Sequence, residues 1–419
     1  MVLYLIQICL GMLLLSGCAN AQTVRSTVQS SSPTAAEIRE PVTILISIDG
    51  FRPDYLDRGV TPHLKALAKS GAYGPMRPAF PTKTFPNHWT LVTGKRPDNH
   101  GIVGNTMVDS ERPDEVFRMS TKDPFWWDQA EPIWITAEEQ GVRSATMFWP
   151  GSEVEFDGKR PNDWWPFSQE LSNDRRIRAV IDWLRRPLEI RPKLITLYFD
   201  TVDTAGHFFG PSNSDKINAA LKEVDDRIGD LVGNLAMLDQ PANIVITSDH
   251  GMTETSPERI IYLDAIMPRD KYRLITDGNY AGIEPLNGNI EEIRGAFITS
   301  HENMECWEKE NIPEHFRYGK NPRVPSIFCL PETGWVVYQN VPDWMTGIGG
   351  GHGYDHRHPD MMAFFLANGP DIKSVGERPV FDSVNIYSIV TYLAGVTPNE
   401  SEGSIAPFRS FLAPQNRGN

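Results

Sequence analysis

Apolar runs alternate with amphipathic segments along most of the chain. The stretch VTILISIDG at residues 42–50 is a continuous apolar run, typical of a strand buried on both faces. Residues 61–71 begin with a Thr cap and end with Gly, which predicts a helix. The pattern also predicts further strands at 144–149, 193–200, 242–251 and 361–369, and further helices at 132–141, 174–184, 214–235 and 384–395.

Strands that alternate with helices indicate an α/β fold with a mainly parallel central sheet and helices on both faces. Between about residues 252 and 350 this alternation fades. We interpret that region as a loop-rich insertion within one catalytic domain at residues 41–415, and not as a second independent domain.

The N-terminal segment resembles a targeting signal. Its apolar run of roughly 15 residues is shorter than the about 20 that a bilayer requires, which favours a signal peptide at residues 1–18. Leu15-Ser16-Gly17-Cys18 resembles the bacterial lipobox, in which Cys18 would be lipidated, while the Ala-Asn-Ala run that follows offers an alternative cleavage site. Residues 19–40 then form a flexible linker. We expect an exported protein, periplasmic or in the outer membrane as a lipoprotein, with this anchor as its only membrane contact.

Composition and cysteine usage restrict the partners. Of the 419 residues 40% are apolar, and the net charge is -14 without a long basic run, which argues against a nucleic-acid partner. Small anionic substrates remain compatible, because metal cations can dominate the local field. Cys306 and Cys329 are the only cysteines beyond the targeting segment. In an exported protein they most simply form a disulfide.

Acidic residues follow three of the predicted strands. Asp49 and Asp249 end two of them, and Asp203 lies just beyond a third. Ligands of open α/β sheets bind at the carboxyl ends of the strands, where three carboxylates would repel one another without a cation. His250 follows Asp249 directly, and the motif DTAGH adds a histidine four residues after Asp203.

A third histidine, His352, lies in the glycine-rich run GIGGGHG. Three Asp and three His suit a borderline divalent ion such as zinc. The glycine-rich run lacks the Gly-Lys-Ser/Thr ending and the strand-loop-helix setting of a phosphate-binding loop. One further segment, FPTKTFPNHWTLVTG at residues 80–94, places two threonines in a Pro-framed loop before a helix. Its residues alone leave Thr82 and Thr84 open as nucleophiles, or as a helix cap.

The motifs IDGFRPDYL, PTKTFPNHWTLVTG, DTAGH, SDHG and GHGYD occur in this order. Together they resemble the ectonucleotide pyrophosphatase/phosphodiesterase family of the alkaline phosphatase superfamily, from about Val42 to the C-terminus. The resemblance implies that Thr84 is the nucleophile. It also implies two zinc ions. The ligands of one would be Asp203, His207 and His352, and those of the other Asp49, Asp249, His250 and the Thr84 oxygen.

The resemblance also implies residues that bind the substrate. Asn105, in HGIVGN, matches the phosphate-binding Asn of the family. Phe85, Tyr198 and Phe167 fall where the family stacks a nucleobase. Phe167 departs from the family pattern, because it follows two tryptophans where a Tyr is more usual.

These assignments predict hydrolysis of phosphodiester or pyrophosphate bonds in small-molecule nucleotides, through a threonyl-phosphate intermediate, with release of nucleoside 5'-monophosphates. An alternative is a phosphodiesterase of the same mechanism that acts on choline-lipid head groups such as glycerophosphocholine, because an aromatic pocket also binds choline by cation–π contact. The Cys/Ser-x-Pro-x-Arg sequence of sulfatases is absent near Thr84. An envelope binding protein without activity is disfavoured, since such a charge cluster is costly to keep without metals.

Overall fold

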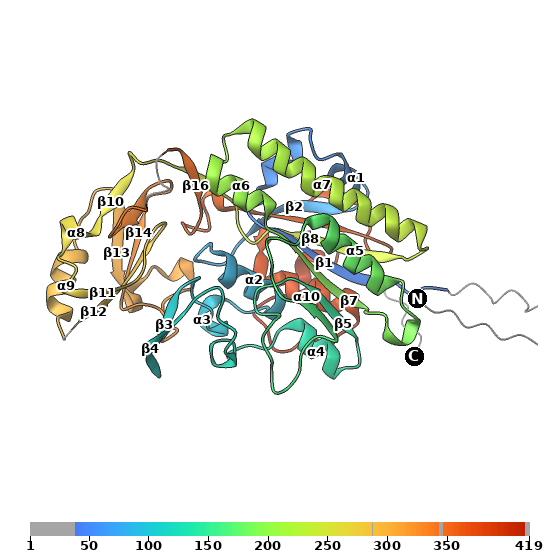
Figure 1. The fold of residues 1–419 in the computed structure, drawn as a ribbon, viewed down its shortest axis with the longest axis horizontal. Helices are drawn as coiled ribbons and strands as arrows, with labels where there is room; N and C mark the ends of the chain where they lie inside the picture. Colours follow the sequence, from blue (N-terminus) through green and yellow to red (C-terminus); the bar gives the residue numbers. More distant parts are fainter. Residues whose placement is uncertain (1–37, 287, 343–346, 415–419) are drawn as a thin grey trace, which may run out of the picture. The chain divides into compact units, whose positions relative to one another are not determined.

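The computed structural model describes residues 38–286, 288–342 and 347–414, and Figure 1 shows their arrangement. The predicted signal peptide, Cys18 and the linker up to residue 37 lie outside the described residues. All elements below belong to the unit that begins at Arg39. Among the described residues, no helix is both long and apolar enough to cross a membrane.

The central sheet is built around β1 (Val42–Ile48), all of whose residues are buried. Within the described residues it has nine strands, in the order β18 (Gly376–Glu377), β2 (Ala72–Arg77), β17 (Ala363–Asn368), β8 (Ala242–Thr247), β1, β7 (Leu194–Phe199), β5 (Ser144–Met147) and β6 (Asp163–Trp165), with β19 (Phe381–Asp382) also paired to β2. β17 runs antiparallel to both of its neighbours, and the other pairs are parallel. The predicted α/β class with a mainly parallel sheet is confirmed.

Helices cover both faces of this sheet, because alternate residues of each strand point to opposite sides. Ile44, Ile46 and Ile48 pack with one set of helices, and Leu45 packs with the other set. The first set comprises α1 (Pro62–Lys69), α5 (Asn173–Leu184) and α7 (Ser214–Met237), and the second α2 (Thr84–Thr93), α4 (Ile133–Glu139) and α10 (Ile386–Ala394). Figure 1 shows α1, α5 and α7 on one side of the strands and α4 and α10 on the other.

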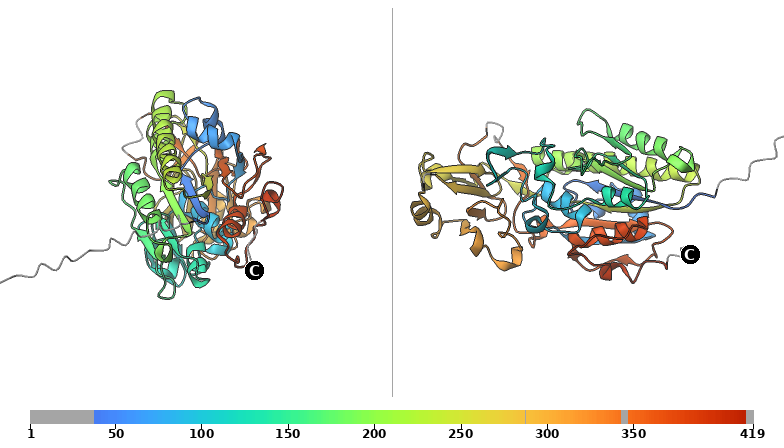
Figure 2. Two further views of the ribbon diagram at one scale, coloured as in Figure 1. Left: turned by 90° about the vertical axis from the view of Figure 1, so that its right-hand side faces the viewer. Right: turned by 90° about the horizontal axis from the view of Figure 1, so that it is seen from below.

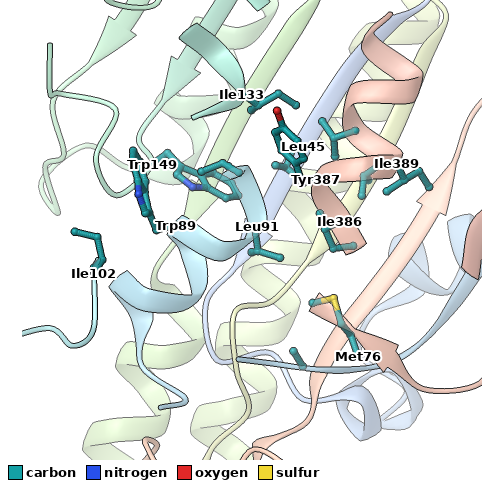
Figure 3. Close-up of a cluster of buried hydrophobic side chains, with 14 of the residues drawn as sticks. Leu45, Met76, Trp89, Leu91, Ile102, Ile133, Trp149, Ile386, Tyr387 and Ile389 are labelled. Carbon is teal, nitrogen blue, oxygen red and sulfur yellow. The ribbon is translucent and has the colours of Figure 1, made fainter. Parts of the chain in front are cut away.

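The core on the α10 side fixes the position of α2, which begins at Thr84. Figure 3 shows Trp89 and Leu91 of α2 packed among side chains from the sheet and α10. Trp89 is fully buried, and the Trp149 indole N–H donates to the His88 carbonyl at 3.1 Å. Burial of such large side chains stabilises the helix by a few kcal/mol each. The start of α2 is therefore held rigidly.

The predicted elements lie where expected, with ends that differ by a few residues. The strand predicted at 242–251 ends at Thr247, because the chain then leaves the sheet in the segment that carries Asp249. The helix expected after the Pro-framed loop is α2, which begins within that segment at Thr84. Among the elements not assigned from the sequence pattern are β2, β6, α6 (Thr201–Phe209) and three short elements. These three are α3 (Pro97–His100), β3 (Met107–Asp109) and β4 (Arg112–Phe117).

The insertion is loop-rich and also contains a small antiparallel sheet. Its strand order is β11 (Tyr272–Thr276), β12 (Ala281–Pro285), β14 (Ile327–Pro331) and β13 (Met304–Glu308). Further short elements of the insertion are β9 (Thr253–Thr255), β10 (Ile260–Tyr262), α8 (Leu263–Ile266), α9 (Ile290–Phe297), β15 (Val336–Tyr338) and β16 (Gly349–Gly351). Figure 1 and the right-hand view of Figure 2 show this small sheet beyond the carboxyl ends of the central strands.

The predicted disulfide between Cys306 and Cys329 is confirmed. The two residues lie directly opposite each other in the antiparallel pair of β13 and β14. Their bond therefore staples two strands of the small sheet.

Candidate active site

Three acidic residues meet at the carboxyl end of the central sheet. Asp49 follows β1 and Asp249 follows β8, and these strands are parallel neighbours. Asp203 lies in α6 (Thr201–Phe209), directly after β7 on the other side of β1. Gly50 lies between them with a φ of 69°, and a Cβ there would lie 3.1 Å from the Cα of Asp203. Glycine is thus required for this close approach.

The first ligand cluster consists of Asp203, His207 and His352, whose ligand atoms lie within 4.8 Å of one another. Asp203 and His207 are four residues apart in α6 and therefore share one helix face. His352 comes from the loop after β16, and its Nε2 lies 3.1 Å from the Nε2 of His207. A helix and a glycine-rich loop that are distant in the sequence thus supply one site.

Backbone carbonyls orient the histidines of both clusters. The Nδ1 atoms of His207, His352 and His250 lie 2.9, 2.8 and 2.9 Å from the carbonyl oxygens of Gly350, Thr82 and Gly251. A carbonyl oxygen only accepts, so each Nδ1 carries the proton and donates. In the neutral ring the lone pair is then on Nε2, the arrangement usual for metal-ligating histidines.

The second cluster contains Asp49, Asp249, His250 and Thr84. The His250 Nε2 lies 2.9 Å from Asp249 Oδ2, 3.4 Å from Asp49 Oδ1 and 3.4 Å from the hydroxyl of Thr84. Asp49, Asp203 and His250 also form a metal-compatible group, so the two clusters adjoin each other. Thr84 therefore lies beside the acids and histidines that the sequence singled out.

Thr82 differs from Thr84 in its surroundings. Its hydroxyl is fully buried, donates to the Tyr354 carbonyl at 3.2 Å and accepts from the Gly353 N–H at 2.8 Å. Thr82 thus anchors the loop that carries His352, while Thr84 is partly exposed to the cavity described below.

The donor set fits divalent cations. Asp49 Oδ1, Asp203 Oδ1 and Asp249 Oδ2 are buried and have no hydrogen-bond partner among the described residues. Burial, with the Asp249 and Asp203 carboxylates beside it, raises the pKa of Asp49 well above its ordinary range. Burial would raise the pKa of Asp249 as well, but the neighbouring His250 and His88 hold it well below its usual range. A cluster of buried, unpaired carboxylate oxygens requires positive charge between them.

His352 is suited to ligation by its protonation state. Burial, together with the nearby His250, Lys83 and His207, holds its pKa well below the ordinary value for histidine. The ring is therefore neutral, as a metal ligand must be.

His88 lies at the centre of the site but received no role from the sequence. It is fully buried, and it forms a metal-compatible group with Asp49 and Asp249. However, its Nδ1 lies 2.8 Å from the carbonyl oxygen of Thr84, and its Nε2 lies 2.8 Å from the Ser47 hydroxyl. Both ring nitrogens are thus engaged, so His88 supports Thr84 from within α2. His88 belongs to the motif FPNHW and lies four residues after Thr84. On a helix this spacing places the two residues on one face, which is the feature of the sequence that could have indicated their contact.

The predicted substrate residues line one cavity of about 450 Å³, together with residues of the first cluster. Asn105 lies beside Thr84, and its Oδ1 accepts the Phe85 backbone N–H at 3.0 Å. This bond fixes the amide orientation and leaves the NH₂ group available to donate.

Aromatic side chains form much of the cavity wall. Phe85, Tyr198 and Phe167 are all present there, and the structure adds Trp127, Phe148, Trp149 and Phe208. Phe167 is 47% exposed, and its ring lies 6.0 Å from that of Tyr198. Tyr198 is nearly buried, and its hydroxyl donates to Asp49 Oδ2 at 2.6 Å. Tyr198 thus touches the cavity and a candidate metal ligand.

Lys83 adds a cation to the cavity. Its ammonium group donates to Asn279 Oδ1 at 2.9 Å, from the loop between β11 and β12. Burial lowers the pKa of Lys83 to about 8, against the opposing effect of the Asp203 carboxylate. The contact links the small sheet to the loop that carries Thr84.

Known proteins resemble the chain over most of its length. The family model "Type I phosphodiesterase / nucleotide pyrophosphatase" matches residues 43–355. The chain is 34% identical over 378 residues to bis(5'-adenosyl)-triphosphatase enpp4 of Xenopus laevis, covering 90% of this chain and 82% of that protein. It is 36% identical over 374 residues to human ectonucleotide pyrophosphatase/phosphodiesterase family member 5, covering 88% and 77%.

A solved structure agrees with these sequence relatives. The murine ectonucleotide pyrophosphatase/phosphodiesterase 5, an inactive Thr-to-Ala variant in complex with AMP, matches with a TM-score of 0.85 and 33% identity. The match covers 89% of this chain and 100% of that one. The chain therefore belongs to the type I phosphodiesterase/nucleotide pyrophosphatase family and is a hydrolase that acts on phosphoric ester bonds.

Proposed function

We propose that this protein hydrolyses phosphodiester and pyrophosphate bonds of nucleotides with two zinc ions and Thr84 as the nucleophile. The observation that carries the proposal is the position of Thr84. Its hydroxyl lies 3.4 Å from the His250 Nε2, and Thr84 also lines the aromatic cavity together with Asp203, His207 and His352 of the first cluster. Imidazole and carboxylate donors in this number suit zinc.

The two clusters would divide the metal ligands as the family resemblance implies. Asp203, His207 and His352 would hold one ion, and Asp49, Asp249, His250 and the Thr84 oxygen the other. When bound, such ions supply positive charge that lowers the pKa of a hydroxyl and stabilises phosphoryl oxygens. The unpartnered oxygens of Asp49, Asp203 and Asp249 support this assignment.

Thr84 would carry the reaction in two displacements. In the first, its oxygen loses its proton and bonds to phosphorus, the bond from phosphorus to the leaving oxygen breaks, and the leaving alcohol or phosphate takes up a proton in exchange. In the second, water attacks the threonyl-phosphate, releases a nucleoside 5'-monophosphate and restores the hydroxyl. Thr84 is the first residue of α2, where the helix dipole favours a negative group.

Asn105 would stabilise the charge that develops on the phosphoryl group. Its Oδ1 is already held by the Phe85 N–H, so the NH₂ group is directed to donate to a non-bridging phosphoryl oxygen. A preoriented donor of this kind needs no reorganisation during the reaction.

Nucleotides are the substrate class best supported. Phe85 and Phe167 provide aromatic surface in the cavity for a base. The murine structure that resembles this chain holds AMP, and curated relatives are named bis(5'-adenosyl)-triphosphatases. A choline phosphodiester would use the same aromatic wall by cation–π contact and is therefore the competing substrate in the test.

The test is steady-state hydrolysis by the zinc-loaded protein. It compares a p-nitrophenyl nucleotide diester, p-nitrophenylphosphocholine and p-nitrophenyl phosphate, with Thr84→Ala and the exposed Thr397→Ala as a matched control. We expect the nucleotide diester to be fastest, and its turnover to disappear in Thr84→Ala and on chelation only. Faster choline turnover would reject the nucleotide substrate. Activity confined to the monoester, or retained in Thr84→Ala, would reject the mechanism.

We also propose that the protein is exported and anchored through a lipid on Cys18. The Leu-Ser-Gly-Cys motif supports this, and so does the Cys306–Cys329 disulfide, which forms in oxidising compartments. Metabolic labelling with a radioactive fatty acid should mark the wild-type protein and leave Cys18→Ala unlabelled. Equal labelling of both would exclude this anchor.

A further inference from the structure

A second cavity of about 360 Å³ lies apart from the catalytic one, and the two share no lining residue. The loop that reaches Thr84 contributes its first part, from Arg77 to Phe80. The segment after His352 contributes His356 and Arg357. The segments that carry Thr84 and His352 thus also line this second cavity, through residues a few positions before Thr84 and a few positions after His352.

The second cavity concentrates positive charge. Four arginines line it, namely Arg77, Arg96, Arg317 and Arg357, against two carboxylates, those of Glu314 and Asp382. This excess stands out in a chain whose net charge is -14. Guanidinium groups present several N–H donors in a planar fork that matches oxyanions.

Two of these arginines are already fixed in place. Asp382 accepts from Arg77 at 2.9 Å and from Arg96 at 3.0 Å, so one carboxylate bridges both. Glu402, outside the lining, also accepts from Arg96 at 2.7 Å, so these two arginines are balanced and the excess charge is that of Arg317 and Arg357. Arg317 and Arg357 are exposed and have no ion-pair partner among the residues that the structure describes. The cavity therefore combines two oriented guanidinium groups with two that are free to bind.

Three lining side chains also hold unsatisfied polar atoms. Arg77 Nε, His356 Nδ1 and the Ser383 hydroxyl oxygen are buried without a hydrogen-bond partner in the described parts of the chain. The nearest carboxylate oxygen to His356 Nδ1, that of Asp355, is 3.8 Å away and beyond hydrogen-bond distance. Buried polar groups are normally paired, so such a cluster calls for a ligand that supplies acceptors.

We propose that this cavity is a second binding site, specific for a phosphate group. A phosphate offers several acceptor oxygens in a tetrahedral arrangement, which suits the surrounding guanidinium, imidazole and hydroxyl groups better than a planar carboxylate does. The source is either inorganic phosphate or the phosphate of a monoester such as a nucleoside monophosphate. The inference does not depend on the chemistry at Thr84.

The test is equilibrium dialysis of the zinc-loaded protein against radiolabelled inorganic phosphate. We compare the wild type with the double variant Arg317→Glu/Arg357→Glu. The control Arg175→Glu/Arg409→Glu makes the same charge change at exposed positions outside both cavities. We expect the wild type and the control to bind one phosphate more per chain than the double variant. Equal binding by all three proteins would overturn the proposal.

Two further measurements separate this site from the catalytic centre. Chelation should leave one phosphate bound to the wild type and none to the double variant, and loss of all phosphate from the wild type would overturn the proposal. Ser383→Ala, which removes a hydroxyl without a partner, should weaken binding by about 5–10-fold. Unchanged binding in that variant would also contradict the site.

Competition identifies the source of the phosphate. Displacement of the label by unlabelled AMP at a lower concentration than by inorganic phosphate would assign the site to a nucleotide. Displacement at equal concentrations would assign it to the phosphate group alone. Displacement by adenosine, which has no phosphate, would overturn the proposal.

Discussion

Tyr198→Phe tests whether this residue serves the metal centre or the substrate. The family resemblance assigns its ring to base stacking, whereas the structure shows its hydroxyl donating to Asp49 Oδ2 at 2.6 Å. Burial and the neighbouring Asp49 carboxylate raise the pKa of Tyr198 well above its usual value, so the hydroxyl keeps its proton. The substitution removes that donor and retains the ring that packs against His88 and Phe167.

The expected magnitude follows from the partner that is lost. A hydrogen bond to a charged group contributes about 1.5–3 kcal/mol. Removal of a group that orients a metal ligand typically weakens metal binding by about 10–100-fold, which corresponds to about 1.4–2.7 kcal/mol. The two ranges agree. We therefore expect the affinity for the zinc ion at Asp49 to fall by one to two orders of magnitude, with little change in KM at saturating zinc.

The assay is phosphodiesterase activity as a function of free zinc, set by a chelator buffer. Phe167→Leu is the matched control, because Phe167 lines the cavity, is 47% exposed and makes no hydrogen bond to a candidate metal ligand among the described residues. That variant should raise KM and leave the zinc dependence unchanged. The opposite result, an unchanged zinc midpoint and a raised KM in Tyr198→Phe, would refute the metal-positioning role and restore base stacking.

Three further predictions concern the reaction and the stability of the fold. Asn105→Ala should lower kcat by about 10²–10³-fold in stopped assays while bound zinc, measured by atomic absorption, stays constant. Replacing both Cys306 and Cys329 by Ser should lower the free energy of unfolding in urea by about 3 kcal/mol, since the bridge spans a sequence separation of 23; a loss below about 1 kcal/mol would show that the small sheet does not need it. Burial lowers the pKa of His100 to about 3, and its Nδ1 accepts the Ile102 N–H, so the folded ring is neutral. The stability that the neutral ring contributes is therefore complete above about pH 6.5 and is lost as the pH falls toward 3, so the free energy of unfolding should drop by about 2 kcal/mol between pH 7.5 and 5. His100→Asn should remove this part of the pH dependence. An identical change of the free energy of unfolding with pH in both proteins would contradict the prediction.

Local sequence pattern was sufficient for the main strands and helices. The run at residues 42–50 is apolar throughout because β1 is covered on both faces, and this burial leaves a direct trace in the sequence. β2 left a weaker trace, since Gly74 and Pro75 interrupt it and its residues alternate between buried and partly exposed. The strands of the insertion are short, and β12 and β13 pair with β14, which lies some twenty to forty residues further along the chain, so this pairing could not be inferred from local pattern.

Within the site, position at strand ends predicted which acids meet. Asp49 and Asp249 each follow a buried strand, and the parallel sheet brings such ends together. The choice between Thr82 and Thr84 could not be made from their neighbours alone, because both stand in the same loop. The two threonines differ in their hydrogen bonds: the Thr82 hydroxyl binds the backbone of Gly353 and Tyr354, a segment about 270 residues further along the chain.

The sequence by itself determined the fold class, the disulfide pair and the set of acids and histidines at the carboxyl end of the sheet. The fold class follows from burial, which the hydrophobic pattern records residue by residue, the disulfide pair from the count of cysteines, and the acids and histidines from their places in motifs at or near the ends of predicted strands. The tertiary structure alone decided that the Tyr198 hydroxyl binds Asp49, that His88 supports Thr84, and that four arginines surround a second cavity. All three depend on side-chain direction, and the first and third also on contacts between segments tens to hundreds of residues apart, which no local pattern encodes.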